Sequence, residues 1–440
     1  MPAGTSAPRY YVELTLPGLE MWPELHLRMQ QMRKLGHRIL VLSTAEAAPL
    51  LADAADEVVV CEDVFSADAL AAALAPYAAD GLRFSIIGDR TWSAQFGAAQ
   101  RLGLPFPGMV GQLNCRIKPR LRRVLADTMP LRATVFSADE ATPERIDALV
   151  AEIGLPFVVK PIWGAASSYV GFVQDREAAH EVIGSTFAAL AEDQDLNPVD
   201  DGDQVWDPRR QILVEEFITE GRELSYEAFV QHGRLVPLLI QEKYKFNREG
   251  NFHFETANLC PTPFVSAEEE TEIHRQLQEA MTKLEVDDTF VHVECKWDGE
   301  RIRIIEVNSR IGGGSVPKML NLFLGIDPRE MTLKLALGET LPTDYPRKGG
   351  FLLGVFVNAH EAGEFVGFEG LEWGRERPEF SFDLEYLQPG TIVPPRDVQS
   401  GRERWLFCYD VFYHCNDQAE IPYLYEETLR RVRLRFAEAG

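Results

Sequence analysis

Two glutamates on neighbouring predicted strands could together hold a divalent metal ion. Residues 290–314 read FVHVECKWDGERIRIIEVNSRIGGG, in which two apolar runs flank an Asp-Gly pair that is typical of a β-hairpin. A two-residue loop would turn Glu294 and Glu306 to opposite sides of the hairpin. A three-residue loop would place Glu306 opposite His292 and diagonal to Glu294, so that both carboxylates face one side. Asn308, two residues after Glu306, then points the same way.

These side chains offer the hard oxygen ligands that Mg²⁺ prefers, and Mg²⁺ completes its shell with water and phosphate oxygens. We therefore predict that Glu294, Glu306 and Asn308 hold Mg²⁺, with Mn²⁺ as an alternative ion, and that the metal bridges the phosphates of a nucleotide. In the competing interpretation the two glutamates are ordinary exposed strand residues. The apolar neighbours of Glu306 favour the metal site, because burying an unpaired carboxylate costs on the order of several kcal/mol.

Arg310 and a glycine run, which includes Gly312 and Gly313, follow the second strand directly. Consecutive glycines let backbone N–H groups approach an anion closely, and a guanidinium beside them can bind a carboxylate or an acyl phosphate. We predict a substrate-binding role for these three residues. A flexible turn before the next helix is the alternative.

An apolar strand that ends in a lysine, LPFVVKP, could place the Lys160 cation beside phosphates. A lysine at a buried strand end needs an anion nearby, and the loop that follows is rich in N–H and hydroxyl donors. Its candidate phosphate-binding residues are Gly164, Ser167 and Ser168. The alternative is a hairpin with a snorkelling lysine.

A third segment, ILVEEFITEGRELSYEAF, could bind a nucleoside. Its connector offers backbone groups beside apolar side chains, which could hold adenine through main-chain hydrogen bonds. The connector residues are Glu215, Glu216, Phe217 and Ile218. Glu223 could then accept hydrogen bonds from ribose hydroxyls, although a plain hairpin with surface glutamates has the same pattern.

The elements that must position these residues begin with strands that alternate with helices. The predicted strands span residues 9–14, 38–43, 57–61 and 84–88, and the predicted helices span 24–35, 67–79 and 91–102. This alternation predicts a parallel sheet covered on both faces, in a Rossmann-like unit. No GxGxxG follows the first strand and no GxxxxGK[ST] occurs, so neither a dinucleotide fingerprint nor a P-loop is present.

We expect four regions along the chain. These are a Rossmann-like domain at residues 1–107, a small lid subdomain with its linking helix at 108–211, a large subdomain with the metal site at 212–330, and a smaller α+β lid or wing at 331–440. Residues 192–207 hold seven carboxylates and are expected to form a solvated surface loop. One clear helix is expected in the large subdomain, near residues 267–284.

The composition indicates an acidic globular protein. Lys and Arg total 44 and Asp and Glu total 68, so the formal charge is 44 − 68 = −24. Such a chain repels phosphate backbones and anionic lipids, which argues against nucleic acid and membranes as partners. The six cysteines lack zinc-type spacing, and neither a secretory signal nor a long apolar run is present, so we expect free thiols and a cytoplasmic location.

Taken together, these segments resemble the ATP-grasp superfamily, and more narrowly its carboxylate–amine ligases of the L-amino acid (dipeptide) ligase type. The ordered matches are Lys118 before a basic helix, Lys160 in VVKP, the loop 164–171, Glu215 to Ile218 with Glu223, then Glu294, and last Glu306 to Arg310. The resemblance covers about residues 116–331. It implies an α/β and α+β architecture, in which an ATP-grasp fold follows the N-terminal Rossmann-like parallel-sheet domain and precedes a C-terminal α+β region. It also implies that Lys118 and Lys160 contact ATP phosphates.

The same resemblance implies a substrate role for Glu255 in the segment GNFHFETANLCP. In dipeptide ligases a glutamate here lies toward the amino group of the first substrate, and a histidine follows three residues later. Asn258 stands at the histidine position in this chain. The phosphate loop also departs from the family pattern, because Ala165, Ala166 and Tyr169 stand where glycines are common.

The resulting hypothesis is ATP-dependent formation of an amide or peptide bond through an acyl phosphate, with release of ADP and phosphate. Lys160 would neutralise phosphoryl charge, Arg310 would hold the acyl-phosphate oxygens, and Glu255 would orient an ammonium group. The expected partners are a small carboxylate and an amine, at least one an amino acid, and a homodimer is what the superfamily suggests. Residues 243–263 and the C-terminal region, with Trp373 and Tyr386, are candidate pocket walls. The alternatives are a carboxylase or phosphoribosylamine-type ligase, and a non-catalytic ATP-binding regulatory protein.

Overall fold

The N-terminal region forms a four-stranded parallel sheet, as the sequence predicts. The computed structural model describes residues 10–15, 23–84, 89–104, 106, 108–164, 168–249, 252–393 and 408–437. The strand order is β3-β2-β1-β4, and every pairing is parallel. The strands are β1 (Tyr10–Leu14), β2 (Arg38–Ser43), β3 (Glu57–Val60) and β4 (Leu82–Phe84), and the helices are α1 (Pro23–Lys34), α2 (Ala48–Leu51), α3 (Ala67–Leu74) and α4 (Trp92–Leu102). The continuous apolar run of β2 is buried, because helices cover both faces of the sheet.

A smaller antiparallel sheet follows, in the order β5-β10-β6-β7. Two helices lead into it, α5 (Met109–Arg116) and α6 (Lys118–Leu125), and two others belong to it, α7 (Pro143–Ile153) and α8 (Arg176–Glu192). Its strands are β5 (Ala133–Ser137), β6 (Phe157–Pro161), β7 (Gly171–Val173) and β10 (Gln211–Glu216). The strand β6 carries Lys160, and the neighbouring strand β10 carries Glu215, which pairs with Val158 and is therefore a diagonal neighbour of Lys160 on the same face.

The largest element of the described chain is an eight-stranded antiparallel sheet in the order β15-β14-β11-β12-β13-β16-β20-β18. Its first five strands are β11 (Arg222–Gln231), β12 (Arg234–Glu249), β13 (Phe252–Cys260), β14 (Thr289–Trp297) and β15 (Ile302–Asn308). The helix α9 (Ala267–Lys283), predicted near residues 267–284, packs its apolar side on one face. The helix α10 (Val316–Leu324) packs on the other face, which also carries the polar residues of interest.

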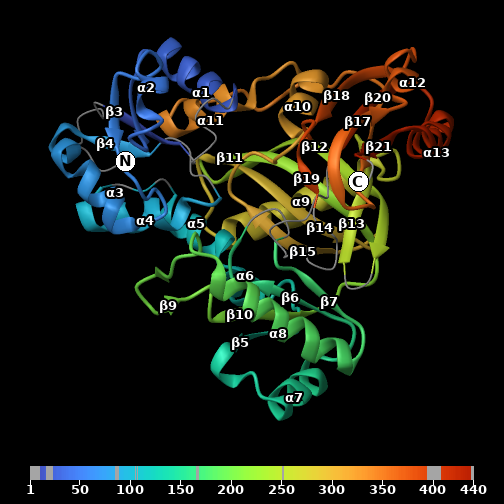
Figure 1. Cartoon of the computed structure of the whole chain (residues 1–440), viewed down its shortest axis with the longest axis horizontal. Helices are drawn as coiled ribbons and strands as arrows, with labels where there is room; N and C mark the ends of the chain where they lie inside the picture. The colour runs from blue at the N-terminus through green and yellow to red at the C-terminus, as the bar shows by residue number, and fades with distance from the viewer. Residues whose placement is uncertain are drawn as a thin grey trace.

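The C-terminal region is α+β, as expected, but three of its strands continue the large sheet instead of forming a separate wing. These strands are β16 (Phe351–Val357), β18 (Phe380–Glu385) and β20 (Tyr409–Cys415). The remaining elements are β17 (Gly363–Glu369), β19 (Ile392–Val393), β21 (Arg433–Phe436), α11 (Pro328–Leu337), α12 (Leu371–Arg375) and α13 (Ile421–Arg431). Figure 1 shows α11 beside α1 of the N-terminal region, where Gln31 donates a hydrogen bond to Asp327.

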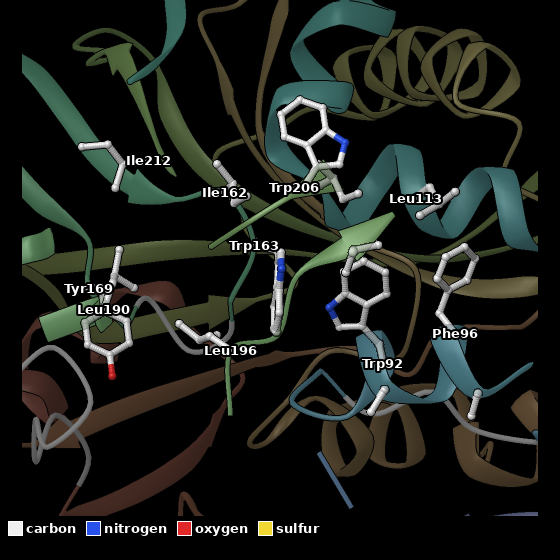
Figure 2. Close-up of a cluster of buried hydrophobic side chains, with 14 of the residues drawn as sticks. Trp92, Phe96, Leu113, Ile162, Trp163, Tyr169, Leu190, Leu196, Trp206 and Ile212 are labelled. Atoms are coloured by element: carbon white, nitrogen blue, oxygen red, sulfur yellow. The ribbon is translucent and has the colours of Figure 1, made fainter. Parts of the chain in front are cut away.

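One hydrophobic cluster joins the N-terminal region to the small sheet. Figure 2 shows Trp163, which follows β6, next to Trp92 of α4, and the two ring centroids are 5.5 Å apart in an edge-to-face contact. Leu196 and Trp206 belong to the same cluster. The chain that leads into the candidate phosphate loop is therefore anchored by packing against two regions.

The acidic stretch at residues 192–207 is the predicted solvated loop only in part, because Asp200 and Asp203 are exposed but two other carboxylates are enclosed. It includes the short ribbon of β8 (Val199–Asp200) and β9 (Val205–Trp206). Asp193 is buried and accepts a hydrogen bond from the Tyr169 hydroxyl. The Asp201 side chain is fully enclosed and pairs with Arg120. The prediction fails for these two residues because a carboxylate with a partner can be buried, and composition alone does not reveal the partner. Among the helices that the structure describes, none is long and apolar enough to cross a membrane.

Candidate active site

The β14–β15 hairpin presents two glutamates on one face of the large sheet. Glu294 pairs directly with Glu306, and His292 pairs with Asn308. Directly paired residues of antiparallel strands share a face. The predicted common side for the three oxygen ligands is therefore confirmed, but the predicted register was wrong. The three-residue loop predicted from the sequence would place Glu306 opposite His292.

A β-bulge explains the difference in register. Trp297 pairs with Ile302, so the hairpin loop has four residues, and the register then shifts between Cys295 and Glu294 because Ile305 has no partner in the ladder. Without this shift in register Glu306 would pair with Val293, whose side chain is buried in the core on the α9 side. The bulge thus returns the Glu306 carboxylate to the face that carries Glu294.

The bulge also provides a docking point for Arg122 of α6. The guanidinium donates to the carbonyl oxygens of Ile304 and Ile305, at 2.8 and 2.7 Å, and to both carboxylate oxygens of Glu215, at 2.6 and 3.1 Å. One arginine therefore connects the β14–β15 hairpin to strand β10 of the small sheet. Charge-assisted hydrogen bonds of this kind fix the relative position of the groups that they join.

Two buried lysines face these carboxylates. Lys118 begins α6, is 5% exposed, and places its Nζ 3.5 Å from Glu306 Oε1. Lys160 of β6 is 8% exposed, and its Nζ lies 2.5 Å from Glu215 Oε1. Burial alone would raise the pKa of Glu215, but Arg122 and Lys160 lower it to about 2, so this carboxylate is charged at neutral pH. That both lysines contact nucleotide phosphates stays a prediction.

A third lysine, which the sequence analysis did not single out, lies among the other acidic residues. The Lys243 Nζ is 2.7 Å from Glu294 Oε2 and 3.0 Å from Glu223 Oε1. Burial lowers the pKa of Lys243, but Glu294, Glu223 and Glu255 together raise it well above its usual value. Burial raises the pKa of Glu255 to about 8, even though Lys243 opposes this change. Glu223, predicted to bind ribose, is thus held by Lys243.

A hydrogen-bonded chain of side chains runs from the β14–β15 hairpin toward β13, which carries the predicted substrate residues. His292 contacts Glu227 Oε1 at 2.5 Å through Nδ1 and Glu294 Oε1 at 3.4 Å through Nε2. The Gln241 amide donates to the same Glu227 oxygen, and Asn258 Nδ2 donates to Gln241 Oε1. Burial would lower the pKa of His292, but Glu227 and Glu294 raise it to about 10. At neutral pH His292 therefore carries a positive charge and donates to both carboxylates.

The glycine run contacts this chain at one of its residues. A Cβ atom at Gly312 would lie 2.7 Å from His292 Nδ1, 2.8 Å from a Val316 methyl group and 3.0 Å from Glu227 Oε2. At Gly313, in contrast, a Cβ atom would have no heavy atom within 4 Å. Glycine is therefore needed at position 312 because neighbouring side chains of the protein lie too close for a Cβ atom. The backbone of Gly313, in contrast, has open space around it.

Arg310 is oriented by an acid from the N-terminal region. Its Nε lies 2.7 Å from Asp89 Oδ2, and Arg116 donates to the other carboxylate oxygen of Asp89 at 2.9 Å. Burial would raise the pKa of Asp89, but the two arginines lower it to about 2. The Arg310 side chain is about one quarter exposed, so part of the guanidinium is accessible to a ligand.

The predicted adenine segment uses two of its backbone donors within the protein. Glu216 N donates to Arg132 O at 2.9 Å, and Phe217 N donates to Pro156 O at 3.1 Å. Nucleotide contacts from this connector would therefore come from its carbonyl groups and from the N–H of the buried Ile218. The Phe217 ring packs edge-to-face on Phe172, with ring centroids 4.7 Å apart.

The candidate phosphate loop is described at its two ends. Gly164 follows Trp163, and Ser168 precedes Tyr169, whereas Ser167 lies outside the described residues. Tyr169 has a φ of 61°, in the region that favours glycine. Its hydroxyl donates to Asp193, and its ring is buried in the cluster of Figure 2, so side-chain packing fixes a backbone conformation that glycine would otherwise provide.

The donor set on the hairpin suits a hard divalent cation. Glu294, Glu306 and Asn308 offer oxygen atoms from one face, and Lys118 and Lys243 balance the two carboxylate charges. Among the described residues, no group of three or more His, Cys, Asp and Glu side chains is arranged to hold a metal ion. These residues therefore fit a site in which phosphate and water complete the shell, rather than an all-protein cage.

Sequence reasoning missed the residues that orient the predicted ones, namely Asp89, Arg122, Glu227, Lys243 and His292. Only His292 had a local signal, because it lies two residues before Glu294 on the same strand and so shares its face. The others come from elements distant in the sequence.

Of the two aromatic residues predicted to line the pocket, Tyr386 donates a hydrogen bond to the buried Asp410, whereas Trp373 packs on Tyr413 in the core.

Comparison with known proteins agrees with this geometry. A family model described as an ATP-grasp domain matches residues 153–318. The crystal structure of the L-amino acid ligase from Bacillus licheniformis superposes with a TM-score of 0.75 at 20% sequence identity, and the match covers 99% of this chain and 100% of that one. The whole fold is thus shared with this structure.

Two curated relatives are similar at the level of sequence. The uncharacterized protein y4rH of Sinorhizobium fredii (strain NBRC 101917 / NGR234) is 27% identical over 373 residues, which cover 83% of this chain and 72% of that protein. Carnosine synthase 1 of Homo sapiens is 27% identical over 212 residues, which cover 48% of this chain and 24% of that protein. The chain therefore matches only about a quarter of the second relative.

Proposed function

Because residues 153–318 form an ATP-grasp domain, we propose that this chain is an ATP-dependent ligase that joins a carboxylate to an amine. In the proposed reaction the substrate carboxylate attacks the γ-phosphorus of ATP, which gives an acyl phosphate and ADP. The amine nitrogen then attacks the acyl carbon, and the C–O bond to phosphate breaks. The observation that carries the proposal is the placement of two buried lysines around the hairpin. Lys118 of α6 lies beside Glu306, and Lys160 of β6 is held by Glu215, which Arg122 connects to the same hairpin.

The basic residues have separate tasks in this proposal. Lys118 and Lys160 neutralise phosphate charge, and Arg122 holds Glu215 beside Lys160, so that the ammonium stays in place before the nucleotide arrives. Glu294, Glu306 and Asn308 would hold Mg²⁺. When bound, the ion would neutralise charge on the transferring phosphoryl group.

The acyl-transfer half of the site lies on the same sheet face. Arg310, oriented by Asp89, would bind the acyl-phosphate oxygens, and Glu255 would accept hydrogen bonds from an ammonium group. Asn258 pairs with Lys243 across β12 and β13, so its side chain shares this face. The relatives named as an L-amino acid ligase and carnosine synthase 1 support an amino acid as one substrate.

A screen for ADP release tests the proposal. The purified chain is incubated with ATP, Mg²⁺ and amino acids, singly and in pairs, and amide products are identified by mass spectrometry. We expect ADP release that depends on both an acid and an amine. ADP release with bicarbonate alone, or no acid-dependent release across the panel, would contradict the proposal.

Variants connect the activity to the hairpin. Glu306→Gln removes one carboxylate charge from the paired face and should lower the rate by roughly 100-fold or more. Glu300→Gln lies on the exposed loop of the same hairpin and is the matched control, for which we expect an unchanged rate. Equal rates in the two variants would remove the metal site from the proposal.

A further inference from the structure

A buried carboxylate on the C-terminal strand β20 has no cationic partner among the residues that the structure describes. Asp410 is 4% exposed, and its Oδ2 accepts a hydrogen bond from the Tyr386 hydroxyl at 2.8 Å. Its Oδ1 has no hydrogen-bond partner among the residues that the structure describes. Burial raises the pKa of Asp410 to about 7. A buried acceptor without a donor is costly, so this oxygen is a candidate for contact with a ligand.

Three other buried carboxylates in the described chain are paired with cations. Glu13 pairs with Arg28, Glu242 with Arg222, and Glu215 with Arg122 and Lys160. No described lysine or arginine forms an ion pair with Asp410. Asp410 differs from these three carboxylates, because no described residue supplies its counter-charge.

A second buried oxygen lies beside Asp410. Phe356 pairs with Asp410 and Val357 with Tyr409, so Asn358, one residue further along, is a diagonal neighbour of Asp410 on the same face. Asn358 is 4% exposed, and its Oδ1 also has no partner in the described part of the chain. Two acceptor oxygens on adjacent segments thus lie close together, and neither receives a hydrogen bond from a described residue.

The register of the sheet places this pair on the face of the candidate active site. Lys243 pairs with Asn258, Asn258 with Gly354, and Gly354 with Phe412, which lies two residues from Asp410 on β20. These residues therefore share one face. Asp410 is also close enough to Glu255 for its charge to raise the pKa of that carboxyl group.

We propose that Asp410 and Asn358 form a subsite for a second cationic group of the substrate, an alkylammonium carried on a side chain. The inference rests on the proposed ligase function and names its substrate class, which is amino acids with an ammonium-bearing side chain. An alkylammonium has three N–H donors, so one such group can satisfy both acceptor oxygens and provide the missing counter-charge. A carboxylate or a neutral apolar side chain can do neither.

Equilibrium binding of L-lysine and L-norleucine, measured by calorimetry on the full chain, tests the subsite without requiring turnover. The two ligands differ in the terminal ammonium. We expect lysine to bind about tenfold more tightly or better, since a hydrogen bond to a charged group contributes that much. In Asp410→Asn the preference for lysine should fall to near one, and Asn358→Leu, which keeps the branching of the side chain but removes its polar atoms, should reduce it.

The matched control is Glu385→Gln, an exposed acid at the end of β18, which should leave the preference unchanged. Circular dichroism confirms that each variant is folded, and Asn358→Leu keeps the test decisive if Asp410→Asn does not fold. Equal binding of the two ligands by the unaltered chain, or an unchanged preference in both subsite variants, would overturn the inference. Failure of the ligase proposal looks different, because lysine would bind selectively while no pair of substrates released ADP.

Discussion

Glu215→Gln is expected to destabilise the chain far more than the same change at the next residue. The Glu215 carboxylate is 2% exposed and receives hydrogen bonds from Arg122 and Lys160. The substitution keeps the shape of the side chain but removes its charge. Lys160, which is also buried, then loses the anion that balances it, and this is the costly half of the change.

The size of the effect follows from the pKa of Glu215. The two cations lower this pKa from 4.5 to about 2, and each pKa unit corresponds to about 1.4 kcal/mol, so the charged form stabilises the fold by roughly 3 kcal/mol. Because the pKa is lower in the folded chain, this stability is present above about pH 4.5 and is lost as the pH falls toward about 2. Glu216 pairs with Arg132 at the surface, so Glu216→Gln should cost less than about 1 kcal/mol.

Urea denaturation followed by tryptophan fluorescence, at about pH 7 and about pH 3, measures both variants against the unaltered chain. We expect a large loss for Glu215→Gln at the higher pH, a smaller loss at the lower pH, and little change for Glu216→Gln. If both substitutions cost the same, or if the cost of Glu215→Gln does not depend on pH, the buried charge pair does not stabilise the fold as argued.

Three further outcomes follow from the structure. Gly312→Ala should lower the thermal midpoint of unfolding by several degrees because the added Cβ would collide with His292 and Val316. Gly313→Ala is the control and should leave the midpoint unchanged, since its Cβ would meet no other atom. Equal midpoints in the two variants would contradict the close contacts at Gly312. Arg310→Ala should abolish amine-dependent ADP release but keep the fold, since Asp89 retains Arg116, and circular dichroism with the ADP assay checks both. Asp410 has a pKa raised from 3.8 to about 7, so the unaltered chain loses stability as the pH rises through this range. Asp410→Asn should remove that loss and so raise the free energy of unfolding, measured by urea denaturation, by up to about 4 kcal/mol near pH 8. A difference in this free energy between the variant and the unaltered chain that stays constant from about pH 5 to about pH 8 would argue against the raised pKa.

Features that depend on local pattern could be predicted from the sequence. The parallel N-terminal sheet follows from alternating apolar runs, and β2 and α9 have nearly the predicted bounds. The common face of Glu294 and Glu306 was also predictable, because alternation along a strand leaves only two outcomes.

Features that depend on distant partners could not be predicted. Lys243 has no local signal, and its position among acidic residues results from the pairing of β12 with β11 and β13. Asp89 and Arg310 are 221 residues apart in the sequence, and only the folded chain brings them together. Asp410 likewise lies on a C-terminal strand whose place in the large sheet, beside β16, is set by tertiary pairing.

The bulge at Ile305 has two separable effects, and deletion of this residue distinguishes them. The deletion moves Glu306 one position along β15, where the register set by the Cys295–Ile304 pair places it opposite Glu294 in a regular ladder. The shared face of the two glutamates is therefore kept, but Arg122 loses one of its two carbonyl acceptors. We expect Mg²⁺-dependent ADP release to persist and the free energy of unfolding to fall by about 1–3 kcal/mol, the contribution of one charge-assisted hydrogen bond. Complete loss of activity in a folded deletion variant would show that the bulge itself, and not only the face it restores, positions Glu306.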